Sequence, residues 1–410
     1  MSASAACCPS PRKAERPRLE VADIVREHGE ELRRQHRLNP AQEKVLRNIE
    51  LCRTAALGGH EDVCPHCKHK RPSYNSCLDR HCPKCLNLRQ AKWVEQRLER
   101  LLPVSYFHVV FTVPALLRPL ALCNPKVVYD LLFHAASRTL LELGLDEKHL
   151  GAQLGVTAVL HTWTRMIGFH PHLHCIVTGG GLSPDGKRWI ASRPDYLLPV
   201  RVLSRLFRGK FLDALSRAYE AGSLQFRGGC AELADPRAFK RFKNELYRTE
   251  WVVYAKEPFE SPEYVFRYLG RYIHKVAITN ERLIKLEDGV VHFHTKGGNV
   301  AALRAIEFLR RFLLHVLPKG FVKIRHYGLF ASSNVKTKLE TAKRILEPPS
   351  TDDQNRKEDR APELYDWREH MRQLTGIDPS VCPNCGKGPM LRIPLDAVGA
   401  ETPPDCLDSS

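Results

Sequence analysis

Residues 170–182 read HPHLHCIVTGGGL, and this stretch decides the fold that we expect. On a β-strand successive side chains point to opposite faces, so His170, His172 and His174 share one face and the residues between them share the other. Imidazoles that converge from one strand can bind a divalent cation. The glycines that follow would let another backbone, or a phosphate chain, come close. The stretch therefore predicts a metal-binding strand rather than a His-rich strand on a wet edge.

The segments on either side of this strand show a mixture of strand and helix patterns. Strands are predicted at 106–114, 154–164, 170–178, 250–257 and 321–331, with short strands within 276–295. Helices are predicted at 21–57, 88–101, 125–144, 197–221, 261–276 and 299–316. Because strands and helices do not alternate regularly, the order predicts an α+β domain with an antiparallel sheet and helices packed on one face.

The bulk composition indicates an intracellular protein that binds nucleic acid. A chain of 410 residues predicts two to three domains. Its formal net charge of +17 makes nucleic acid the expected partner. No apolar run approaches the roughly 18 residues that a membrane helix needs, and the N-terminus lacks the apolar core of a signal peptide. We therefore expect no membrane partner and a cytoplasmic location.

Two Cys-x-x-Cys pairs predict a structural zinc site. The pairs are Cys64 with Cys67 and Cys82 with Cys85, and fourteen residues separate them. Four thiolates from two such pairs complete a tetrahedral zinc site. Zinc binding would contribute on the order of 10 kcal/mol to ordering this segment.

More candidate ligands surround these pairs than one zinc ion needs. A second zinc would draw on nearby groups, with one set joining each pair: Cys52 and His60, and Cys77 and His81. Near the C-terminus, Cys382 and Cys385 form a third pair, with only Cys406 and His370 as additional ligands. That pair either binds another zinc or stays without metal.

The predicted helix 261–276 carries three tyrosines at spacings of four, so that they share one face. They are Tyr264, Tyr268 and Tyr272. A separate cationic stripe consists of Arg267, Arg271 and Lys275. Tyrosines at this spacing often flank a core, but a tyrosine hydroxyl can also attack a phosphodiester. Such a step needs a cation near the phosphate, which the histidine strand could hold, while the basic stripe could bind flanking DNA phosphates.

Taken in order, the motifs resemble those of the insertion-sequence 91 family of transposases, which belong to the HUH (His-hydrophobe-His) class of rolling-circle nucleases. The resemblance covers about residues 40 to 346. It rests on five stretches: GGHEDVCPHCKHKRPSYNSCLDRHCPKC at 58–85, FTVP at 111–114, HPHLHCIVTGGGL at 170–182, YLGRYIHKVAITN at 268–280 and KIRHYGLFA at 323–331. It implies a HUH-nuclease-like antiparallel sheet preceded by a small Cys-rich zinc-binding domain.

The resemblance also implies a reaction. His172 and His174 would bind Mg²⁺ or Mn²⁺, and Tyr268 and Tyr272 would be the two nucleophiles. The enzyme would nick single-stranded DNA at transposon ends, form a 5′-phosphotyrosine, and join the strand to target DNA by rolling-circle transposition in the bacterial nucleoid. Relatives that use a third histidine carry it on the preceding strand, which makes His161 the first choice for the third ligand and His170 the second.

These inferences divide the chain into six parts. They are a disordered segment (1–20), a helix plus zinc-binding domain (21–100), the catalytic nuclease domain (101–300), its C-terminal part (301–346), a linker (347–366) and a tail with Cys-x-x-Cys (367–410). The main alternative is a zinc-dependent DNA-binding protein without catalysis. A zinc hydrolase that uses the same histidines ranks lower, because no general-base carboxylate stands beside them in the sequence.

Overall fold

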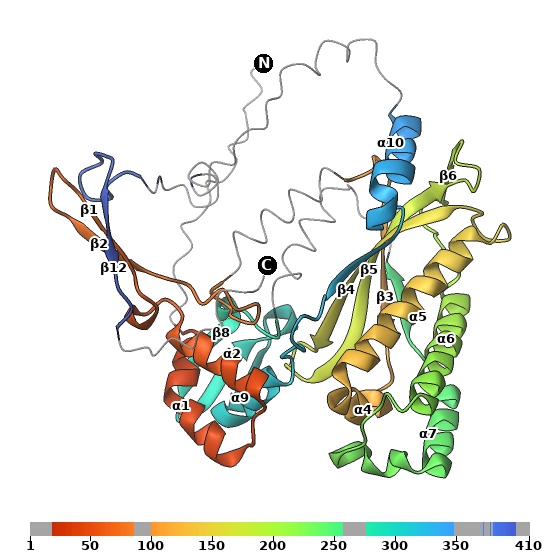
Figure 1. Ribbon diagram of the computed structural model, residues 1–410, viewed down its shortest axis with the longest axis horizontal. Coiled ribbons are helices and arrows are strands. Elements are labelled where there is room, and N and C mark those ends of the chain that lie inside the picture. The colour runs from red at the N-terminus through yellow and green to blue at the C-terminus, as the bar shows by residue number, and fades with distance from the viewer. Residues whose placement is uncertain are drawn as a thin grey trace, which may run out of the picture.

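Six antiparallel strands form the central sheet of this computed structural model, which describes residues 19–85, 100–256, 276–347, 372, 378 and 380–398. Five strands lie in the order β11-β4-β5-β3-β7, and β6 pairs with one end of β5. Their bounds are β3 Tyr106–Thr112, β4 Gln153–Trp163, β5 Phe169–Leu182, β6 Trp189–Ala191, β7 Val253–Lys256 and β11 Ile324–Gly328. The two long strands β4 and β5, which carry the predicted histidine ligands, therefore pair side by side within the sheet (Figure 1).

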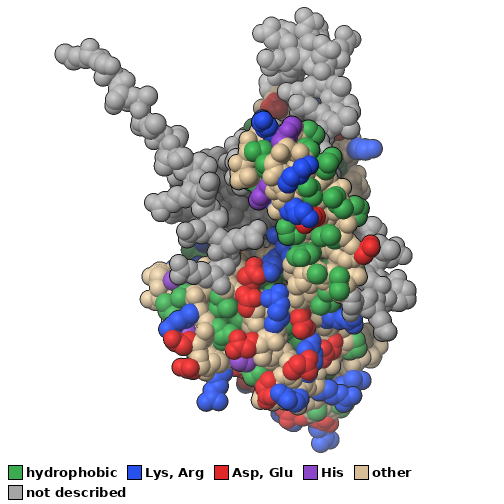
Figure 2. Space-filling view, turned by 90° about the vertical axis from the view of Figure 1, so that its left-hand side faces the viewer, with side chains coloured by type: hydrophobic (Ala, Val, Ile, Leu, Met, Phe, Trp, Pro, Cys, Tyr) green, Lys and Arg blue, Asp and Glu red, His purple; other side chains and the backbone are tan. Residues whose placement is uncertain are grey.

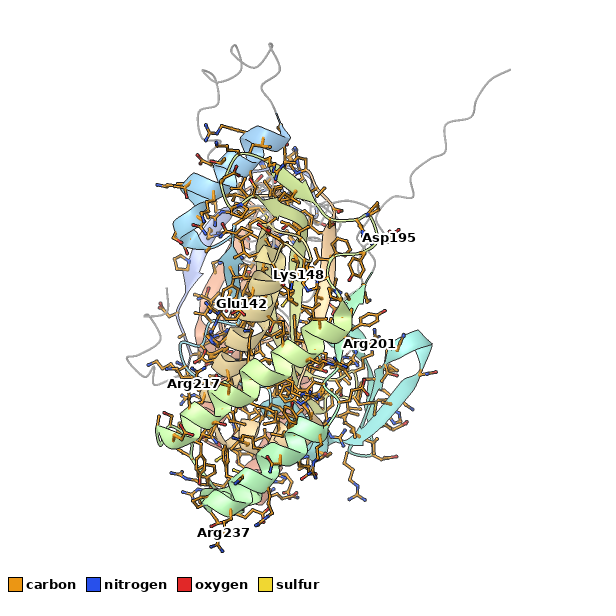
Figure 3. The ribbon with its side chains drawn as sticks, turned by 90° about the vertical axis from the view of Figure 1, so that its right-hand side faces the viewer. Glu142, Lys148, Asp195, Arg201, Arg217 and Arg237 are labelled. Atoms are coloured by element: carbon orange, nitrogen blue, oxygen red, sulfur yellow. The ribbon has the colours of Figure 1, made fainter. Side chains whose placement is uncertain are left out.

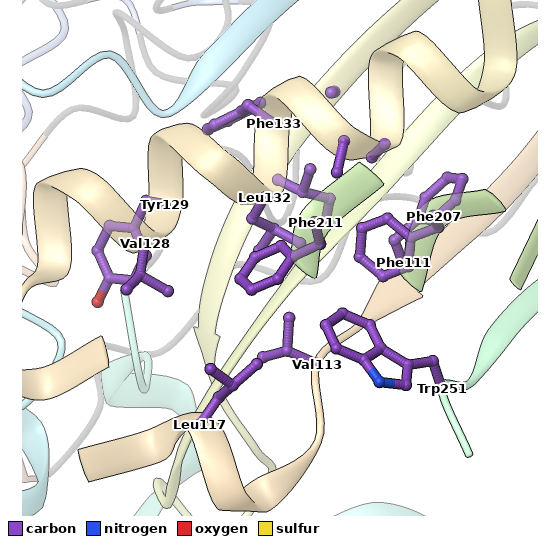
Figure 4. Packing of buried hydrophobic residues seen from close by; sticks show 14 of the residues in the cluster. Phe111, Val113, Leu117, Val128, Tyr129, Leu132, Phe133, Phe207, Phe211 and Trp251 are labelled. Atoms are coloured by element: carbon purple, nitrogen blue, oxygen red, sulfur yellow. The ribbon is translucent and has the colours of Figure 1, made fainter. Parts of the chain in front are cut away.

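Helices cover one face of this sheet and bury its apolar residues. They are α4 (Arg118–Cys123), α5 (Pro125–Leu145), α6 (Val200–Glu220) and α7 (Pro236–Arg248). Phe111 of β3 packs in one cluster with Phe207, Phe211 and Trp251, and Leu173 of β5 belongs to the same core (Figure 4). α6 and α7 lie on the outer side of this layer (Figure 3). Lys210 of α6 pairs with Glu142 of α5. This arrangement confirms the α+β prediction and leaves the histidine face of β5 away from these helices.

A second core joins the N-terminal helices to a segment more than two hundred residues later. It packs α1 (Val21–Gln35), α2 (Pro40–Leu51) and α9 (Ala305–Leu313) against a three-stranded sheet. The strands of that sheet are β8 (Leu283–Glu287), β9 (Val290–His294) and β10 (Val300–Arg304), in the order β10-β9-β8. Ile167, in the turn between β4 and β5, belongs to the same core. The N-terminal region is therefore packed against the end of the central sheet that carries the histidines.

A third, small sheet has the order β12-β1-β2 and projects from the N-terminal helices (Figure 1). Its strands are β1 (Gly59–Val63), β2 (Lys70–Tyr74) and β12 (Leu391–Leu395). Figure 2 shows the molecule from the left-hand side of Figure 1. The small sheet there presents basic, histidine and hydrophobic side chains, whereas acidic and basic side chains are mixed on the surface below it. At the opposite end of the molecule α10 (Glu340–Leu346) packs over the central sheet.

Two predicted helices differ from the structure. The helical region expected at 21–57 consists of two helices, α1 and α2, because Asn39 caps a new helix whose first residue is Pro40. The helix expected at 299–316 begins only at Ala305, since residues 300–304 pair with β9 as strand β10. Pairing with the preceding strand in a β-hairpin has overridden a locally helical sequence there. The helix α7 was not predicted from the sequence, although Asp235 caps it and Pro236 is its first residue.

Some predictions fall outside the described residues. These are most of the disordered segment 1–20, most of the helix at 88–101, nearly all of the tyrosine helix at 261–276, most of the linker at 347–366, and the candidate ligands His370 and Cys406. Among the helices that are described, none has the length and hydropathy needed to cross a membrane.

Candidate metal centres

Three histidines from two paired strands converge on the face of the central sheet that lies away from α5 and α6. His161 of β4 stands opposite His172 of β5, and His174 is two residues further along the same strand. One ring nitrogen from each lies within 4.8 Å of the others. A shift in register between β4 and β5 occurs next to His161, as is common beside functional sites. The structure thus brings together the two histidines of the HUH motif and the first-choice third histidine.

Hydrogen bonds orient these rings. Nδ1 of His172 lies 2.7 Å from the carbonyl oxygen of His170, so Nδ1 carries the proton and donates it. Its Nε2 is then an unprotonated acceptor, and it lies 3.1 Å from Nε2 of His174. The ring of His161 stacks on Trp163 with centroids 4.5 Å apart. A fixed tautomer of this kind is what metal-ligating histidines commonly show.

The environment keeps the three rings uncharged at neutral pH. Burial lowers the pKa of His172 to about 4. Burial, with the neighbouring histidines, also lowers the pKa of His161 and His174 well below the ordinary histidine value. Lys256 of β7 and the buried Lys323 act in the same direction on His174 and His161, respectively. Neutral imidazoles have the free lone pairs that a metal requires.

The geometry of the three histidines fits a divalent cation. Two nitrogens bound to one ion at right angles, at about 2.1 Å each, lie about 3.0 Å apart. The separation of 3.1 Å between His172 Nε2 and His174 Nε2 matches this value. Three imidazoles suit transition metals better than Mg²⁺, which prefers oxygen ligands.

Two further histidines adjoin this site. The ring of His170, the second-choice ligand, is not part of the group of three, and its backbone carbonyl instead orients His172. His108 of β3 was not expected at the site, yet its Nε2 lies 2.7 Å from Nδ1 of His174 and the two rings stack. The signal in the sequence was that His108 shares the non-core face of the alternating strand at 106–114 with Val110 and Thr112. Its contact places it as a group that orients His174.

The three glycines at the other end of β5 serve chain packing. A Cβ on Gly179 would lie 2.8 Å from the carbonyl oxygen of Ser105, and one on Gly181 would lie 2.4 Å from that of Gln153. Both distances are shorter than a Cβ tolerates. Of the two roles expected from the sequence, close approach of another backbone is the one that the structure shows.

The cysteines form two groups, and neither is the predicted set of four. The inner cluster consists of Cys52, Cys77, Cys82 and Cys85. Sγ of Cys85 lies 3.4 Å from that of Cys52 and 3.6 Å from that of Cys77. A zinc ion with Zn–S bonds of about 2.3 Å holds its tetrahedral sulfurs about 3.8 Å apart, so the inner cluster fits zinc.

The outer cluster consists of Cys64, Cys67, Cys382 and Cys385. Its sulfur pairs are Cys64 with Cys385, 3.6 Å apart, and Cys67 with Cys382, 3.7 Å apart. The two Cys-x-x-Cys pairs of residues 64–85 thus belong to different clusters. The reason is that Cys64 and Cys67 lie in the turn between β1 and β2, which points away from the N-terminal helices (Figure 1).

The two histidines proposed as extra zinc ligands lie outside both clusters. Nε2 of His60 lies 3.8 Å from a carboxylate oxygen of Asp62. His81 is buried and uses both ring nitrogens, since Nδ1 lies 2.9 Å from Asp79 and Nε2 accepts from the backbone N–H of Leu317. His81 therefore docks the loop before Cys82 onto the chain near β11, which brings the inner cluster close to the central sheet.

The predicted nucleophiles Tyr268 and Tyr272, Tyr264, and the basic residues Arg267, Arg271 and Lys275 lie outside the described residues. The residues at both ends of that segment are described. Lys256, the last residue of β7, pairs with His108. Val276 packs in the same hydrophobic cluster as Ile167, in the turn that links the two histidine strands.

Comparison with known proteins matches two family models. One, described as "Transposase zinc-binding domain", matches residues 24–113, and the other, described as "Putative transposase", matches residues 155–338. The first contains the inner cluster and half of the outer cluster, and the second contains all three converging histidines. No solved structure gives a significant match.

Two curated relatives extend over most of the chain. "Putative transposase y4qJ" of Sinorhizobium fredii is 47% identical over 402 residues, which cover 95% of this chain and 98% of the relative. "Transposase for insertion sequence element IS801" of Pseudomonas savastanoi pv. phaseolicola is 26% identical over 377 residues, 84% of each chain. The similarity to both therefore extends over most of the chain.

Proposed function

Because the chain belongs to the insertion-sequence 91 family of transposases, we propose that it nicks and rejoins single-stranded DNA at transposon ends through a 5′-phosphotyrosine. The observation that carries the proposal is the convergence of His161, His172 and His174 on one face of the central sheet. A zinc-dependent DNA-binding protein without catalysis would have no use for three neutral imidazoles at metal-binding distance.

The ends of the tyrosine segment support a site that combines histidines and tyrosines. The segment that contains the tyrosines, residues 257–275, starts directly after Lys256. Lys256 lies close enough to lower the pKa of His174. It ends at Val276, which packs in one cluster with Ile167 beside the histidine strands. We propose that Tyr268 and Tyr272 act as the nucleophiles of the site that the histidines form.

The proposed step is a transesterification. The hydroxyl oxygen of one tyrosine forms a bond to the scissile phosphorus, and the bond from phosphorus to the 3′ oxygen breaks. The phenolic proton ends on the released 3′-hydroxyl, so no water and no external energy source are consumed. The second tyrosine then serves a second cleavage, and attack by a 3′-hydroxyl on the phosphotyrosine rejoins the strand.

The histidines would hold Mn²⁺ or Mg²⁺, which polarises the scissile phosphate and stabilises the charge on its oxygens. His108 keeps the ring of His174 in place, and the carbonyl of His170 keeps that of His172 in place. Arg267, Arg271 and Lys275 would bind the flanking DNA phosphates. The cysteine clusters would hold structural zinc, and the zinc-binding domain would help to bind the transposon ends.

The experiment is a nicking assay on single-stranded DNA of the element ends with Mn²⁺, followed by detection of the covalent adduct on denaturing gels. Replacing both Tyr268 and Tyr272 by phenylalanine should abolish the adduct. His172→Ala should lower the nicking rate by at least about a hundredfold. His170→Ala is the matched control, because it removes an imidazole from the same strand face but keeps the carbonyl that orients His172.

The outcomes separate the two functions. An adduct in the double tyrosine variant would refute the assigned nucleophiles. Unchanged nicking in His172→Ala would refute the metal site. If the wild-type protein binds the DNA with a steep salt dependence but neither nicks it nor forms an adduct with any divalent cation, the non-catalytic DNA-binding function is the correct one.

A further inference from the structure

The small projecting sheet is assembled from the two ends of the described chain. β12 runs antiparallel to β1, with Val63 opposite Leu391 and Gly59 opposite Leu395. The buried carboxylate of Asp62 accepts hydrogen bonds from Arg71 of β2 and from Arg392 of β12. One carboxylate on the central strand thus binds an arginine from the strand on each side.

The sequence before β1 is shaped to receive the C-terminal segment. Gly58 has a φ of +64°, and a Cβ there would lie 2.8 Å from the carbonyl oxygen of Leu395. The backbone N–H of Val398 donates to the carbonyl of Ala55. A side chain at position 58 would be strained and would collide with the returning chain, so glycine matches the presence of β12.

The two Cys-x-x-Cys turns that form the outer cluster have the same hydrogen-bonding pattern. In the first, Cys64 N–H donates to the carbonyl of His69 and Lys68 N–H donates to that of Cys64. In the second, Cys382 N–H donates to the carbonyl of Lys387 and Gly386 N–H donates to that of Cys382, at the same relative positions. The fifth residue of each turn has a positive φ, 61° at Lys68 and 70° at Gly386.

A positive φ is uncommon for lysine, so the first turn adopts this conformation against its local preference. The repeated geometry makes both turns present two sulfurs toward a common point. The four sulfurs lie within 4.8 Å of one another, as zinc requires, and the Asn384 amide lies 3.6 Å from the sulfur of Cys67. Such an N–H contact supports a thiolate ligand from outside the metal shell.

We infer that Cys64, Cys67, Cys382 and Cys385 bind one zinc ion that fastens residues 380–398 to the N-terminal zinc-binding domain. Cys382 and Cys385 lie beyond both matched family regions, which end at residues 113 and 338. The ligands Cys67 and Cys382 are 315 positions apart, so the site forms only when the intervening chain has folded and brought them together.

The test measures zinc content and local exchange in the full-length chain. Wild type should contain two zinc ions, one per cysteine cluster. The double variant Cys382→Ser/Cys385→Ser should contain one, and so should Cys67→Ser, from the other side of the same site. Cys123→Ser, a described cysteine outside both clusters, is the matched control and should keep both ions.

Hydrogen exchange of the β12 amides distinguishes the lost site from general misfolding. In both outer-cluster variants exchange in residues 391–395 should rise at least tenfold, while exchange in β4 and β5 stays at the wild-type rate. Two zinc ions in the Cys382→Ser/Cys385→Ser variant would overturn the inference. If Cys67→Ser lost a zinc ion while the double variant kept both, Cys64 and Cys67 would take their other ligands from elsewhere.

Discussion

The inner and outer cysteine clusters contain the same ligand chemistry but are built in different ways. Cys52 and Cys85 of the inner cluster are 33 positions apart, and three of its four cysteines lie in the hydrophobic core with α1, α2 and α9. In the outer cluster, partners are more than three hundred positions apart. Among the described residues, none of its four cysteines belongs to a hydrophobic cluster, and β12 beside them is largely exposed.

The comparison teaches that Cys-x-x-Cys spacing identifies the ligands but not their partners. Each of the turns at 64–67 and 82–85 can supply two of the four ligands of a tetrahedral zinc ion. The inner pair finds its partners locally because α2 ends at Leu51, directly before Cys52. The outer pair is carried away by the hairpin of β1 and β2 and meets the chain that returns as β12. We expect the inner zinc to stabilise a core and the outer zinc to hold a segment in place.

The largest effect should follow removal of an inner ligand. Cys85→Ser should lower the free energy of unfolding by more than about 4 kcal/mol, because a core that contains a metal site loses the metal. Cys385→Ser, its outer counterpart, should change the same quantity by less than about 1 kcal/mol. Thermal unfolding followed by circular dichroism measures both variants. Equal losses in the two would break the distinction between a core zinc and a fastening zinc.

An intermediate effect should separate the clusters by the rate of zinc release. Two of the four outer cysteines, Cys67 and Cys385, are partly exposed, whereas Cys77 is the one inner cysteine that is. With a colorimetric chelator in excess, the outer zinc should leave at least about ten times faster, which corresponds to about 1.4 kcal/mol in the barrier.

Wild type should therefore release zinc in two phases. The Cys382→Ser/Cys385→Ser variant, which keeps only the inner cluster, should show the slow phase alone. A fast phase of the same amplitude in that variant would contradict the assignment of the exposed site.

The smallest effect concerns the ion pair beside the outer cluster. Arg392→Ala removes one partner of Asp62, but the arginine is half exposed and Arg71 remains bonded to the same carboxylate. We expect a loss below about 1 kcal/mol, seen as faster hydrogen exchange in β12. Lys70→Ala, which breaks an exposed pair with Glu61, is the control. Release of the outer zinc by Arg392→Ala would mean that the strand, not the metal, holds the segment.

Local patterns in the sequence were sufficient for the fold class and for the arrangement of the histidines. Alternation in 106–114, 154–164 and 170–178 corresponds to β3, β4 and β5, because a half-buried strand needs only residues two apart to show its faces. The same alternation places His172 and His174 on one face. His161 was selected as the third ligand from the family resemblance, and the structure places it opposite His172.

Interactions between segments far apart in the chain could not be predicted from the sequence. His108 reaches His174 from a different strand, and no spacing within either strand reveals that contact. The grouping of the cysteines likewise depends on where the chain returns after more than three hundred residues.

The sequence by itself determined the strand periodicity, the supply of thiolate and imidazole ligands, the positive charge and the family. These are local or compositional properties, which each segment carries without its neighbours. The tertiary structure decided which cysteines share an ion, which histidines face one another and that the C-terminal segment completes the N-terminal sheet. Those outcomes require segments far apart in the chain to meet, and the cost in chain entropy is offset only by the cores and sheets that the whole molecule forms.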